Sequence, residues 1–274
     1  MNVIVTGGTR GLGKSVVEYF LTKKFNVATC SISKKSCEEF NTNVLFDSNR
    51  LYIERCDVSK QDEVEKFISN VLKKYQKIDI LINNAGIHVP IEKFYNNDAT
   101  EWINTINVNL NGVFLMSHYV VKHMITQNFG RIINLSGGGA TKPMPLYSAY
   151  SASKAAIVRL TECMAEELLG YDILVNSIAP GFLATDIHKS SIDAGKELLG
   201  DYYEFTLKNL KEGGANIQNS IDLIELLSSK KCVFNGKLIS AVFDDWKGIQ
   251  NSGELSKELF TLRRVDNQFI GEIN

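Results

Sequence analysis

Short apolar runs alternate with longer amphipathic stretches along most of the chain. Seven runs rich in Val, Ile and Leu show little polar alternation and are bounded by Gly, Asn or Asp, which is typical of strands buried on both faces. The stretches between them carry apolar residues at helical spacing. The predicted strands are Val3–Thr6, Asn26–Ser31, Leu51–Asp57, Ile78–Asn83, Gly130–Ser136, Ile173–Ile178 and Lys237–Ala241. The predicted helices are Leu12–Lys24, Lys60–Tyr75, Thr100–Gln127, Tyr150–Leu169 and Ser220–Leu227.

Strict alternation of strand and helix predicts an α/β fold, a Rossmann-type doubly wound parallel sheet with helices on both faces. No linker, internal repeat or low-complexity tract interrupts the chain, so a single domain is expected over residues 1–245. Residues 186–219 depart from the alternation and are expected to form a lid, because a long insertion beyond parallel strands commonly covers a site. Residues 246–274 form a C-terminal extension that we expect to cover the site or a neighbouring subunit.

Bulk composition excludes several classes of protein. Hydrophobic residues make up 44% and charged residues 22% of the 274 residues, and the net charge of −1 predicts no nucleic-acid or anionic-membrane partner. The five cysteines contain no Cys-x-x-Cys pair and no signal peptide precedes the first strand, so a reduced, cytoplasmic protein is expected. The four histidines lack metal-ligand spacing, and no metal is expected. His88 is expected to be a pocket-wall residue.

A glycine-rich turn directly follows the first predicted strand. It reads Thr6-Gly7-Gly8-Thr9-Arg10-Gly11-Leu12-Gly13. A strand that feeds a glycine turn and then a helix brings backbone N–H groups close to a dinucleotide pyrophosphate. The spacing Gly-x3-Gly-x-Gly differs from the commoner Gly-x-Gly-x-x-Gly, so the turn alone is weak evidence.

Tyr150 and Lys154 lie one turn apart on a predicted helix and therefore share a face. An ammonium beside a phenol favours the phenolate, which lowers a pKa that is ordinarily about 10 toward neutrality. The pair is suited to exchange a proton with an alcohol or carbonyl oxygen. Together with the glycine turn, it predicts hydride transfer between a dinucleotide and a substrate.

At this point the chain resembles the short-chain dehydrogenase/reductase family from Met1 to about Asp245. The matching motifs, in family order, are Thr6-Gly7 through Gly11-x-Gly13, Cys56-Asp57-Val58, Asn83-Asn84-Ala85-Gly86, Asn107-Val108-Asn109-Leu110, Tyr150-x3-Lys154 and Pro180-Gly181-x3-Thr185. The resemblance implies a dinucleotide-binding catalytic domain with cofactor contacts at Thr6, Gly7, Thr9, Arg10, Gly11, Leu12, Gly13, Ser31, Asp57, Val58, Asn83, Ala85, Gly86, Tyr150, Lys154, Pro180, Gly181 and Thr185.

The resemblance also implies the catalytic roles. Tyr150 is the proton donor in reduction, Lys154 also binds the nicotinamide ribose, and Asn109 holds a water behind Lys154. The family's serine, which hydrogen-bonds the substrate oxygen, ordinarily stands 13 positions before the tyrosine, and here that position is Gly137. We expect the triple glycine 137–139 to direct Ser136 into the site, with Thr141 or the glycine N–H groups as alternatives.

Cofactor choice depends on the end of the second predicted strand, where an Asp would bind the adenine ribose and repel a 2′-phosphate. Ser31 occupies that position, and Arg10 or Lys34 is available to bind a phosphate. NADP is therefore the expected cofactor, with NAD remaining open.

The expected reaction interconverts a carbonyl and a secondary alcohol, with a sugar or sugar-nucleotide as one suggested substrate. The alternatives are nucleotide-sugar epimerase or dehydratase chemistry and a cofactor-binding protein with impaired catalysis. Apolar residues on more than one side of the two longest helices predict a homodimer or homotetramer.

Overall fold

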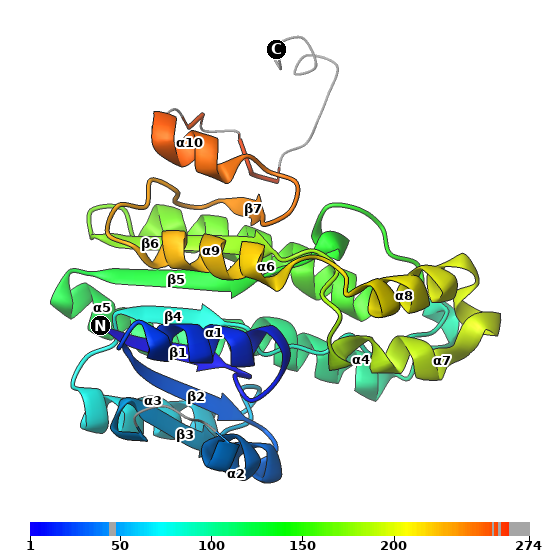
Figure 1. Ribbon diagram of the computed structural model, residues 1–274, viewed down its shortest axis with the longest axis horizontal. Coiled ribbons are helices and arrows are strands. Elements are labelled where there is room, and N and C mark those ends of the chain that lie inside the picture. Colours follow the sequence, from blue (N-terminus) through cyan, green and yellow to red (C-terminus); the bar gives the residue numbers. More distant parts are fainter. Residues whose placement is uncertain (44–47, 254, 257–258, 263–274) are drawn as a thin grey trace.

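Seven parallel strands form one sheet at the centre of the molecule (Figure 1). The computed structural model describes residues 1–43, 48–253, 255–256 and 259–262. Strand order is β3-β2-β1-β4-β5-β6-β7, so the order reverses between β1 and β4. Because ligands of such sheets bind beyond the strands' carboxyl ends at this reversal, the topology already locates a site. The strands are β1 Asn2–Thr6, β2 Asn26–Ser31, β3 Leu51–Arg55, β4 Ile80–Asn83, β5 Gly130–Leu135, β6 Ile173–Ala179 and β7 Leu238–Ser240.

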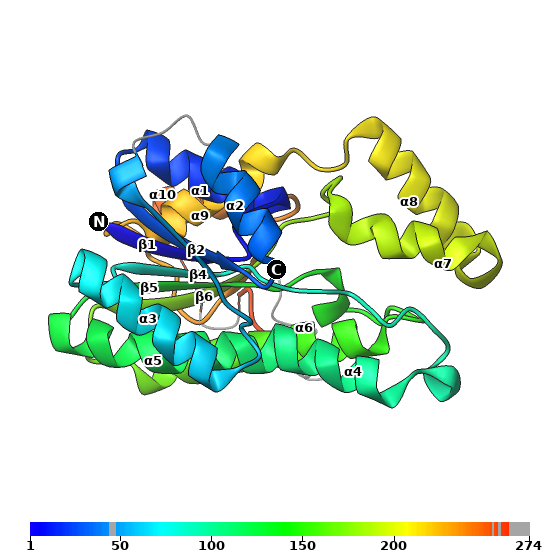
Figure 2. The same ribbon diagram turned by 90° about the horizontal axis from the view of Figure 1, so that it is seen from below.

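Helices cover both faces of the sheet, as predicted (Figure 2). On one face lie α1 Gly11–Thr22, α2 Lys34–Asn43, α9 Ile217–Ser228 and α10 Trp246–Ser252. On the other lie α3 Gln61–Tyr75, α4 Ala99–Ile106, α5 Gly112–Gln127 and α6 Ser148–Glu167. Two further helices, α7 Lys189–Leu199 and α8 Asp201–Glu212, pack on each other beyond the strands' carboxyl ends.

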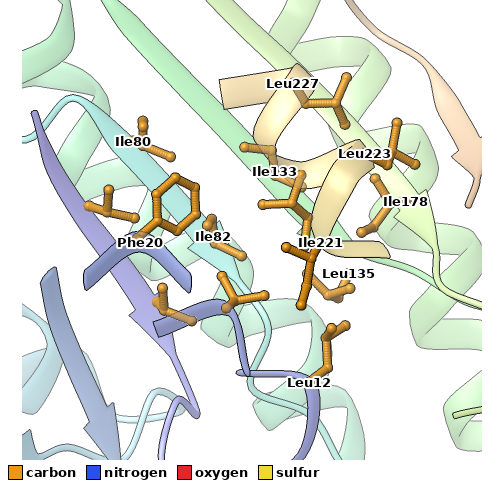
Figure 3. Packing of buried hydrophobic residues seen from close by; sticks show 14 of the residues in the cluster. Leu12, Phe20, Ile80, Ile82, Ile133, Leu135, Ile178, Ile221, Leu223 and Leu227 are labelled. Atoms are coloured by element: carbon orange, nitrogen blue, oxygen red, sulfur yellow. The ribbon is translucent and has the colours of Figure 1, made fainter. Parts of the chain in front are cut away.

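Alternate residues of each strand point to opposite faces and build two apolar cores. Ile80 and Ile82 of β4 face α1 and α9, where Phe20 and Leu223 fill the space between helix and sheet (Figure 3). Leu81, between them, belongs to the core beneath α3 and α5. Each such fully buried side chain contributes about 1.5–3 kcal/mol to folding, so the two cores hold the strand ends in fixed relative positions.

The predicted elements differ from the observed ones in four segments. Residues 100–127 form α4, a π-helical turn at Asn107–Asn111 and then α5, instead of one helix. Helix α2 was not predicted, because only Cys37 and Phe40 of its described side chains are buried and its apolar pattern is weak. The segment expected to form a lid contains α7 and α8. The C-terminal extension contains α10, and its residues 254, 257–258 and 263–274 lie outside the described residues.

No helix in the described part of the chain is long and apolar enough to cross a membrane.

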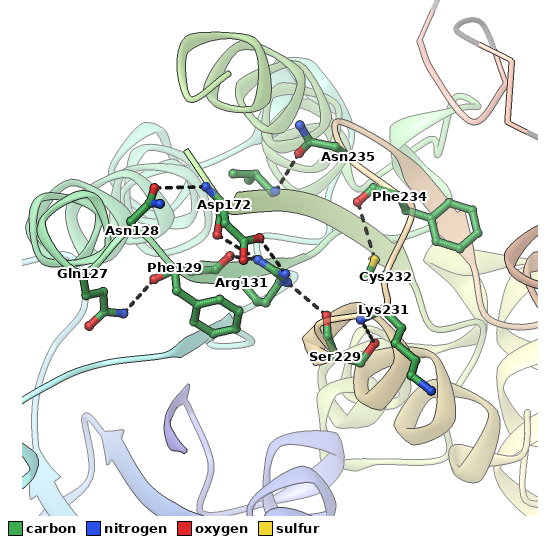
Figure 4. A network of polar contacts seen from close by, with 12 residues as sticks. Gln127, Asn128, Phe129, Arg131, Asp172, Ser229, Lys231, Cys232, Phe234 and Asn235 are labelled. Atoms are coloured by element: carbon green, nitrogen blue, oxygen red, sulfur yellow. Dashed lines mark hydrogen bonds and ion pairs between the residues drawn. The ribbon is translucent and has the colours of Figure 1, made fainter. Parts of the chain in front are cut away.

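A buried guanidinium ties together the opposite, amino-terminal end of the sheet (Figure 4). Arg131 of β5 is 1% exposed and lies 4.5 Å from the centre of the Phe129 ring. Its side chain donates to the carbonyls of Gly130, Asp172 and Ser229 at 2.8–3.1 Å and pairs with the Asp172 carboxylate at 2.9 Å. It thereby joins β5, β6 and the segment that follows α9.

We expect Arg131→Met to lower the free energy of unfolding by at least about 2 kcal/mol, because three carbonyls each lose a hydrogen bond from a buried guanidinium. Urea unfolding followed by circular dichroism measures this. Asp172→Asn is the matched control. It should lower the free energy of unfolding by less, because the Asp172 side chain is 53% exposed. An equal decrease in the free energy of unfolding in the two variants would contradict the role assigned to the carbonyl contacts.

Candidate active site

The glycine turn that follows β1 is hydrogen-bonded to the end of β4. The Thr6 hydroxyl accepts hydrogen bonds from the Asn84 and Ala85 N–H groups at 3.0 and 2.9 Å. The Asn84 amide donates to the Thr6 and Gly7 carbonyls at 2.9 and 3.2 Å. A Cβ at Gly13 would overlap the same amide, so only glycine fits there. Asn84 was not singled out from the sequence, although it lies within the Asn83–Gly86 motif.

The turn leads into the amino terminus of α1, which begins at Gly11. Gly7 and Gly11 have φ of +66° and +54°, a region that favours glycine. Arg10 precedes the helix with an exposed side chain, and Thr9 is half-buried. The Leu12 side chain packs into the apolar core, so this residue presents only its backbone to the turn. The glycines and the helix end form a cradle that fits a pyrophosphate.

Ser31 ends β2 beside a group of basic residues, where an adenine ribose is expected. Its hydroxyl accepts from the Ser33 N–H at 3.3 Å. Lys34 is highly exposed and lies 3.8 Å from Glu38. Arg55, which sequence analysis did not select, donates to the Ile32 carbonyl and so lies at the same strand end. No carboxylate stands at position 31.

Two residues expected to bind the cofactor have local roles. The Asp57 carboxylate accepts from the Ser59 N–H and hydroxyl at 3.0 and 2.7 Å. Val58 is buried, and its side chain fills the space next to Gly112. Both residues lie just beyond the end of β3, and their cofactor contacts stay predictions.

Asn83 does not turn its side chain toward the cradle. Its amide donates to the Ser117 hydroxyl at 3.1 Å and to the Asn134 side chain at 2.8 Å, and the residue is 3% exposed. The Asn83 side chain is therefore a buried link between β4, β5 and α5, and the predicted cofactor contact of this residue is left to its backbone. Ala85, by contrast, lies against Gly7.

Tyr150 and Lys154 share one face of α6, as their spacing predicted. The Lys154 ammonium lies 5.5 Å from the centre of the Tyr150 ring and donates to the Leu135 carbonyl at 2.6 Å. Lys154 is 5% exposed, and Gly86 leaves space beside its ammonium. The pair therefore lies at the ends of β4 and β5, next to the cradle.

Burial dominates the acid–base properties of this pair. It raises the pKa of Tyr150 to about 12, with the Tyr202 phenol as a second cause. It lowers the pKa of Lys154 to about 8. The expectation of a Tyr150 pKa lowered toward neutrality is thus wrong for the protein alone. The phenol is protonated at neutral pH, which suits it to donate a proton.

Asn109 is fully buried in the π-helical turn Asn107–Asn111. Its amide donates to the Ile87 carbonyl at 2.8 Å and the Ser153 hydroxyl at 3.0 Å, and its oxygen accepts from the Ile87 N–H at 2.9 Å. These contacts leave the side chain occupied by protein groups. Asn109 therefore fixes the backbone after β4 against α6, and its expected contact with a water behind Lys154 stays a prediction.

Position 137, and not Ser136, faces the Tyr150 hydroxyl. A Cβ built on Gly137 would overlap that hydroxyl. The Ser136 hydroxyl donates to the Lys154 carbonyl at 3.1 Å, and the residue is 4% exposed. Neighbouring residues at a strand end point to opposite sides, so the triple glycine does not redirect Ser136 as predicted.

The loop after β6 approaches the cradle from the other side. Gly181 has φ +82° and lies against Val242. Pro180 accepts from the Ser220 hydroxyl of α9. The Thr185 side chain is 3.5 Å from a Cβ built on Gly11. The Pro180–Thr185 loop and the glycine turn therefore meet, as their predicted shared role requires.

An aromatic cluster covers Tyr150 on the side of α7 and α8. Six rings form a closed circuit in which neighbouring centroids are 3.8–5.7 Å apart. The members are His88, Tyr147, Phe182, His188, Tyr202 and Phe205. The His88 centroid is 6.2 Å from that of Tyr150. Sequence analysis placed His88 at a pocket wall but missed the cluster, whose members are far apart in the chain.

Two hydrogen bonds connect the start of α7 to this cluster. The His88 Nε2 atom lies 2.6 Å from the Ser190 hydroxyl, and the Tyr147 hydroxyl donates to Ser191 at 2.9 Å. Burial, with His188 as a second cause, lowers the pKa of His88 to about 4. Burial likewise lowers the pKa of His188 to about 4. Both imidazoles are therefore neutral at pH 7.

No cluster of three or more metal-ligating side chains occurs among the described residues.

The His88 pKa predicts acid sensitivity. An unfolded histidine binds a proton below about pH 6.5, whereas His88 in the fold does so only near pH 4, so stability falls as pH falls between these values. We expect His88 to account for a loss of roughly 2 kcal/mol between pH 7 and pH 5. His88→Gln keeps a hydrogen-bonding group but does not titrate, so urea unfolding should show a flatter pH dependence. Parallel curves for the variant and the unaltered protein would refute this.

Comparison with known proteins agrees with this geometry. The family model described as short chain dehydrogenase matches residues 1–195. An NAD-dependent glycerol dehydrogenase of Listeria innocua is 33% identical over 188 residues, which cover 69% of this chain and 72% of that protein. A 3-oxoacyl-[acyl-carrier-protein] reductase of Staphylococcus epidermidis is 30% identical over 239 residues, covering 87% and 96%. The structure of ElxO with NADP bound has a TM-score of 0.76 at 25% identity, covering 88% of this chain and 96% of that one.

The family model covers well over half of the chain and includes the glycine turn and the Tyr150–Lys154 pair. The chain belongs to the short-chain dehydrogenase/reductase family and is an NAD(P)-dependent oxidoreductase.

Proposed function

We propose that the protein is an NADP(H)-dependent oxidoreductase that interconverts a carbonyl and a secondary alcohol, with Tyr150 as the proton donor and acceptor. The observation that carries the proposal is the position of Tyr150 and the buried Lys154 beside the glycine cradle. The bound dinucleotide supplies or accepts the hydride. Thr6, Asn84 and the glycines hold its pyrophosphate turn in place, and the Pro180–Thr185 loop closes the opposite side.

Tyr150 and Lys154 divide the proton chemistry. In reduction, the protonated phenol donates to the substrate oxygen as negative charge builds there. Lys154 stabilises the resulting phenolate electrostatically and is placed to hold the nicotinamide ribose. Asn109 acts as a positioning residue, because it fixes Ile87 and Ser153 around this pair.

Gly137 favours a second candidate, a cofactor-binding protein with impaired catalysis, because no hydroxyl stands at the position that faces Tyr150. We infer that the Thr141 hydroxyl takes over the contact with the substrate oxygen. Thr141 borders the same cavity as Gly137, which supports this role. Nucleotide-sugar epimerase or dehydratase chemistry has no comparable support.

Tyr150→Phe should lower kcat by at least about 10²-fold, because it removes the proton donor and leaves the ring in place. NADPH-dependent reduction of a panel of carbonyls measures the rate, and fluorescence titration measures cofactor binding, which should be retained. Tyr171→Phe, on an exposed tyrosine outside the site, is the control. Near-normal turnover in Tyr150→Phe would refute the assignment. If the unaltered protein binds cofactor but reduces no carbonyl, the second candidate, a cofactor-binding protein with impaired catalysis, is correct.

The charges of the residues near the expected adenine ribose support a preference for NADP. Ser31 offers no carboxylate to repel a 2′-phosphate, and Arg10 is exposed at the start of α1. ElxO, a structural relative, has been determined with NADP bound. The glycerol dehydrogenase relative is NAD-dependent, so both cofactors occur among similar proteins.

We expect NADPH to bind more tightly than NADH, and Arg10→Ala to narrow the difference, because a charge-assisted contact to the phosphate is lost. Fluorescence titration with each cofactor measures both affinities. Lys14→Ala is the matched control, since Lys14 is also exposed on α1 but pairs with Glu18. An unchanged NADPH-to-NADH ratio in Arg10→Ala would show that Arg10 does not contact the phosphate.

For the substrate, we infer a small polyhydroxylated carbonyl compound such as a sugar, with residues 186–219 as the lid. Support for the lid comes from the hydrogen bonds of Ser190 and Ser191 to the site. No arginine occurs between Arg159 and Arg263, so the lid offers no bidentate contact for the diphosphate of a sugar-nucleotide. One relative is a dehydrogenase of glycerol, itself a small polyol.

We also infer a homodimer or homotetramer, with a mass in solution that is a multiple of 30.6 kDa. Ile103 of α4 and Phe114 of α5 are 55% and 49% exposed and support an interface on this face. The five cysteines are free thiols, which supports a reducing, cytoplasmic environment.

A further inference from the structure

The lid carries a second phenol, Tyr202 of α8, close to Tyr150. We propose that the Tyr202 hydroxyl binds a second oxygen of the substrate, attached to the carbon next to the reacting carbonyl. Tyr202 is then a specificity-determining residue that selects oxygenated carbonyl compounds over plain ketones. The inference rests on the proposed carbonyl reduction by Tyr150 and adds to it the group that the lid recognises.

Ring contacts place Tyr202 beside Tyr150. The Tyr147 ring, directly before α6, has its centroid 5.5 Å from that of Tyr202 and 5.7 Å from that of His88. The His88 ring in turn lies edge-on to Tyr150 at 6.2 Å. The two phenols also interact electrostatically, because Tyr202 contributes to the raised pKa of Tyr150. A substrate oxygen that contacts Tyr150 therefore brings the neighbouring atoms of the substrate close to Tyr202.

Packing holds the Tyr202 ring in one position. The ring is stacked on Phe205 of the same helix at 5.6 Å and lies edge-on to Tyr147. The buried Thr206 hydroxyl donates to the Tyr202 carbonyl at 2.8 Å. The Tyr147 hydroxyl donates to Ser191 of α7 at 2.9 Å, which joins the lid to the ring against which Tyr202 packs. Because the phenol is already ordered, it loses little conformational freedom when it binds a ligand.

The Tyr202 hydroxyl is available to a ligand. Neither it nor the Tyr150 hydroxyl makes a hydrogen bond to another group in the described part of the chain. The Tyr147 hydroxyl, by contrast, is used within the protein by Ser191. A phenol that is partly buried ordinarily finds a partner, and it can both donate and accept. A substrate oxygen beside Tyr150 provides that partner for Tyr202.

The chemistry of a phenol determines what Tyr202 selects. A hydroxyl or a second carbonyl oxygen on the carbon next to the reacting carbonyl can accept the Tyr202 proton. A methyl group at the same place would leave the phenol without a partner, and a site that is built to bind an oxygen discriminates against such an analogue. Both kinds of oxygen-bearing substrate share this chemistry, and suitable probes distinguish them.

Tyr202→Phe tests the role of the hydroxyl alone. It keeps the ring that packs on Tyr147 and Phe205, so the fold and the position of the lid should be retained. Tyr203→Phe is the matched control, since Tyr203 is the next residue of α8, is half-buried as well, and takes no part in the aromatic cluster. Urea unfolding should be the same for both variants and the unaltered protein.

Carbonyl probes of equal size identify the contact. Hydroxyacetone, 2,3-butanedione and butanone carry a hydroxyl, a carbonyl oxygen and a methyl group, respectively, on the carbon next to the reacting carbonyl. The pair 2-hydroxycyclohexanone and 2-methylcyclohexanone repeats the comparison in a ring. Tyr202→Phe should lower kcat/KM about 10-fold for the two hydroxyketones and less than about 2-fold for the two methyl analogues. Tyr203→Phe should change kcat/KM less than about 2-fold for every probe, and NADPH affinity should change less than about 2-fold in both variants.

Several results would overturn the inference and leave the proposed carbonyl reduction standing. These are an equal loss of kcat/KM on the oxygenated and methyl probes in Tyr202→Phe, no loss on any probe, or turnover of other carbonyls with none of these probes reduced. A loss confined to 2,3-butanedione would support the inference and identify the second oxygen as a carbonyl. Absence of turnover on every carbonyl, with NADPH still bound, would refute the proposed function itself.

Discussion

The close approach of the turn after β1 to the end of β4 is the constraint on which the site depends. Thr6 and Asn84 exchange hydrogen bonds across it, and Gly13 leaves room for the Asn84 amide. A side chain at Gly13 would push these strand ends apart and, with them, the start of α1. The same strand end continues into Gly86 and Ile87, which contact Lys154 and Asn109. Cofactor cradle and catalytic pair are therefore parts of one packed unit, and neither can shift without the other.

Most of the fold follows from local patterns. Buried parallel strands are nearly continuous apolar runs, and all seven were found within a few residues of their observed ends. The errors lie where local pattern carries little information. Helix α2 is mostly polar. In the π-helical turn at Asn107–Asn111, the buried Asn109 bonds to Ile87 and Ser153, a tertiary contact that no periodicity reveals.

The site was predictable to the level of the backbone but not of every side chain. Spacing correctly marked Gly137 as the position that faces Tyr150, whereas the choice of Ser136 failed because its hydroxyl turns to the Lys154 carbonyl. The Asn83 side chain serves the core, and its neighbour Asn84 holds the turn. The aromatic cluster joins residues from 88 to 205. Burial raises the pKa of Tyr150, contrary to the direction expected from its spacing to Lys154. Such long-range packing cannot be read from spacing.

The geometry at Gly137 also constrains how this sequence can change. With the present backbone, a Cβ at that position overlaps the Tyr150 hydroxyl, so a serine at position 137 requires the Tyr150 side chain to shift. The strand end itself is held to α6 by Lys154, whose ammonium donates to the Leu135 carbonyl and whose carbonyl accepts from the Ser136 hydroxyl. A side chain at position 137 would therefore change the position of the Tyr150 phenol, the group that is proposed to exchange the proton.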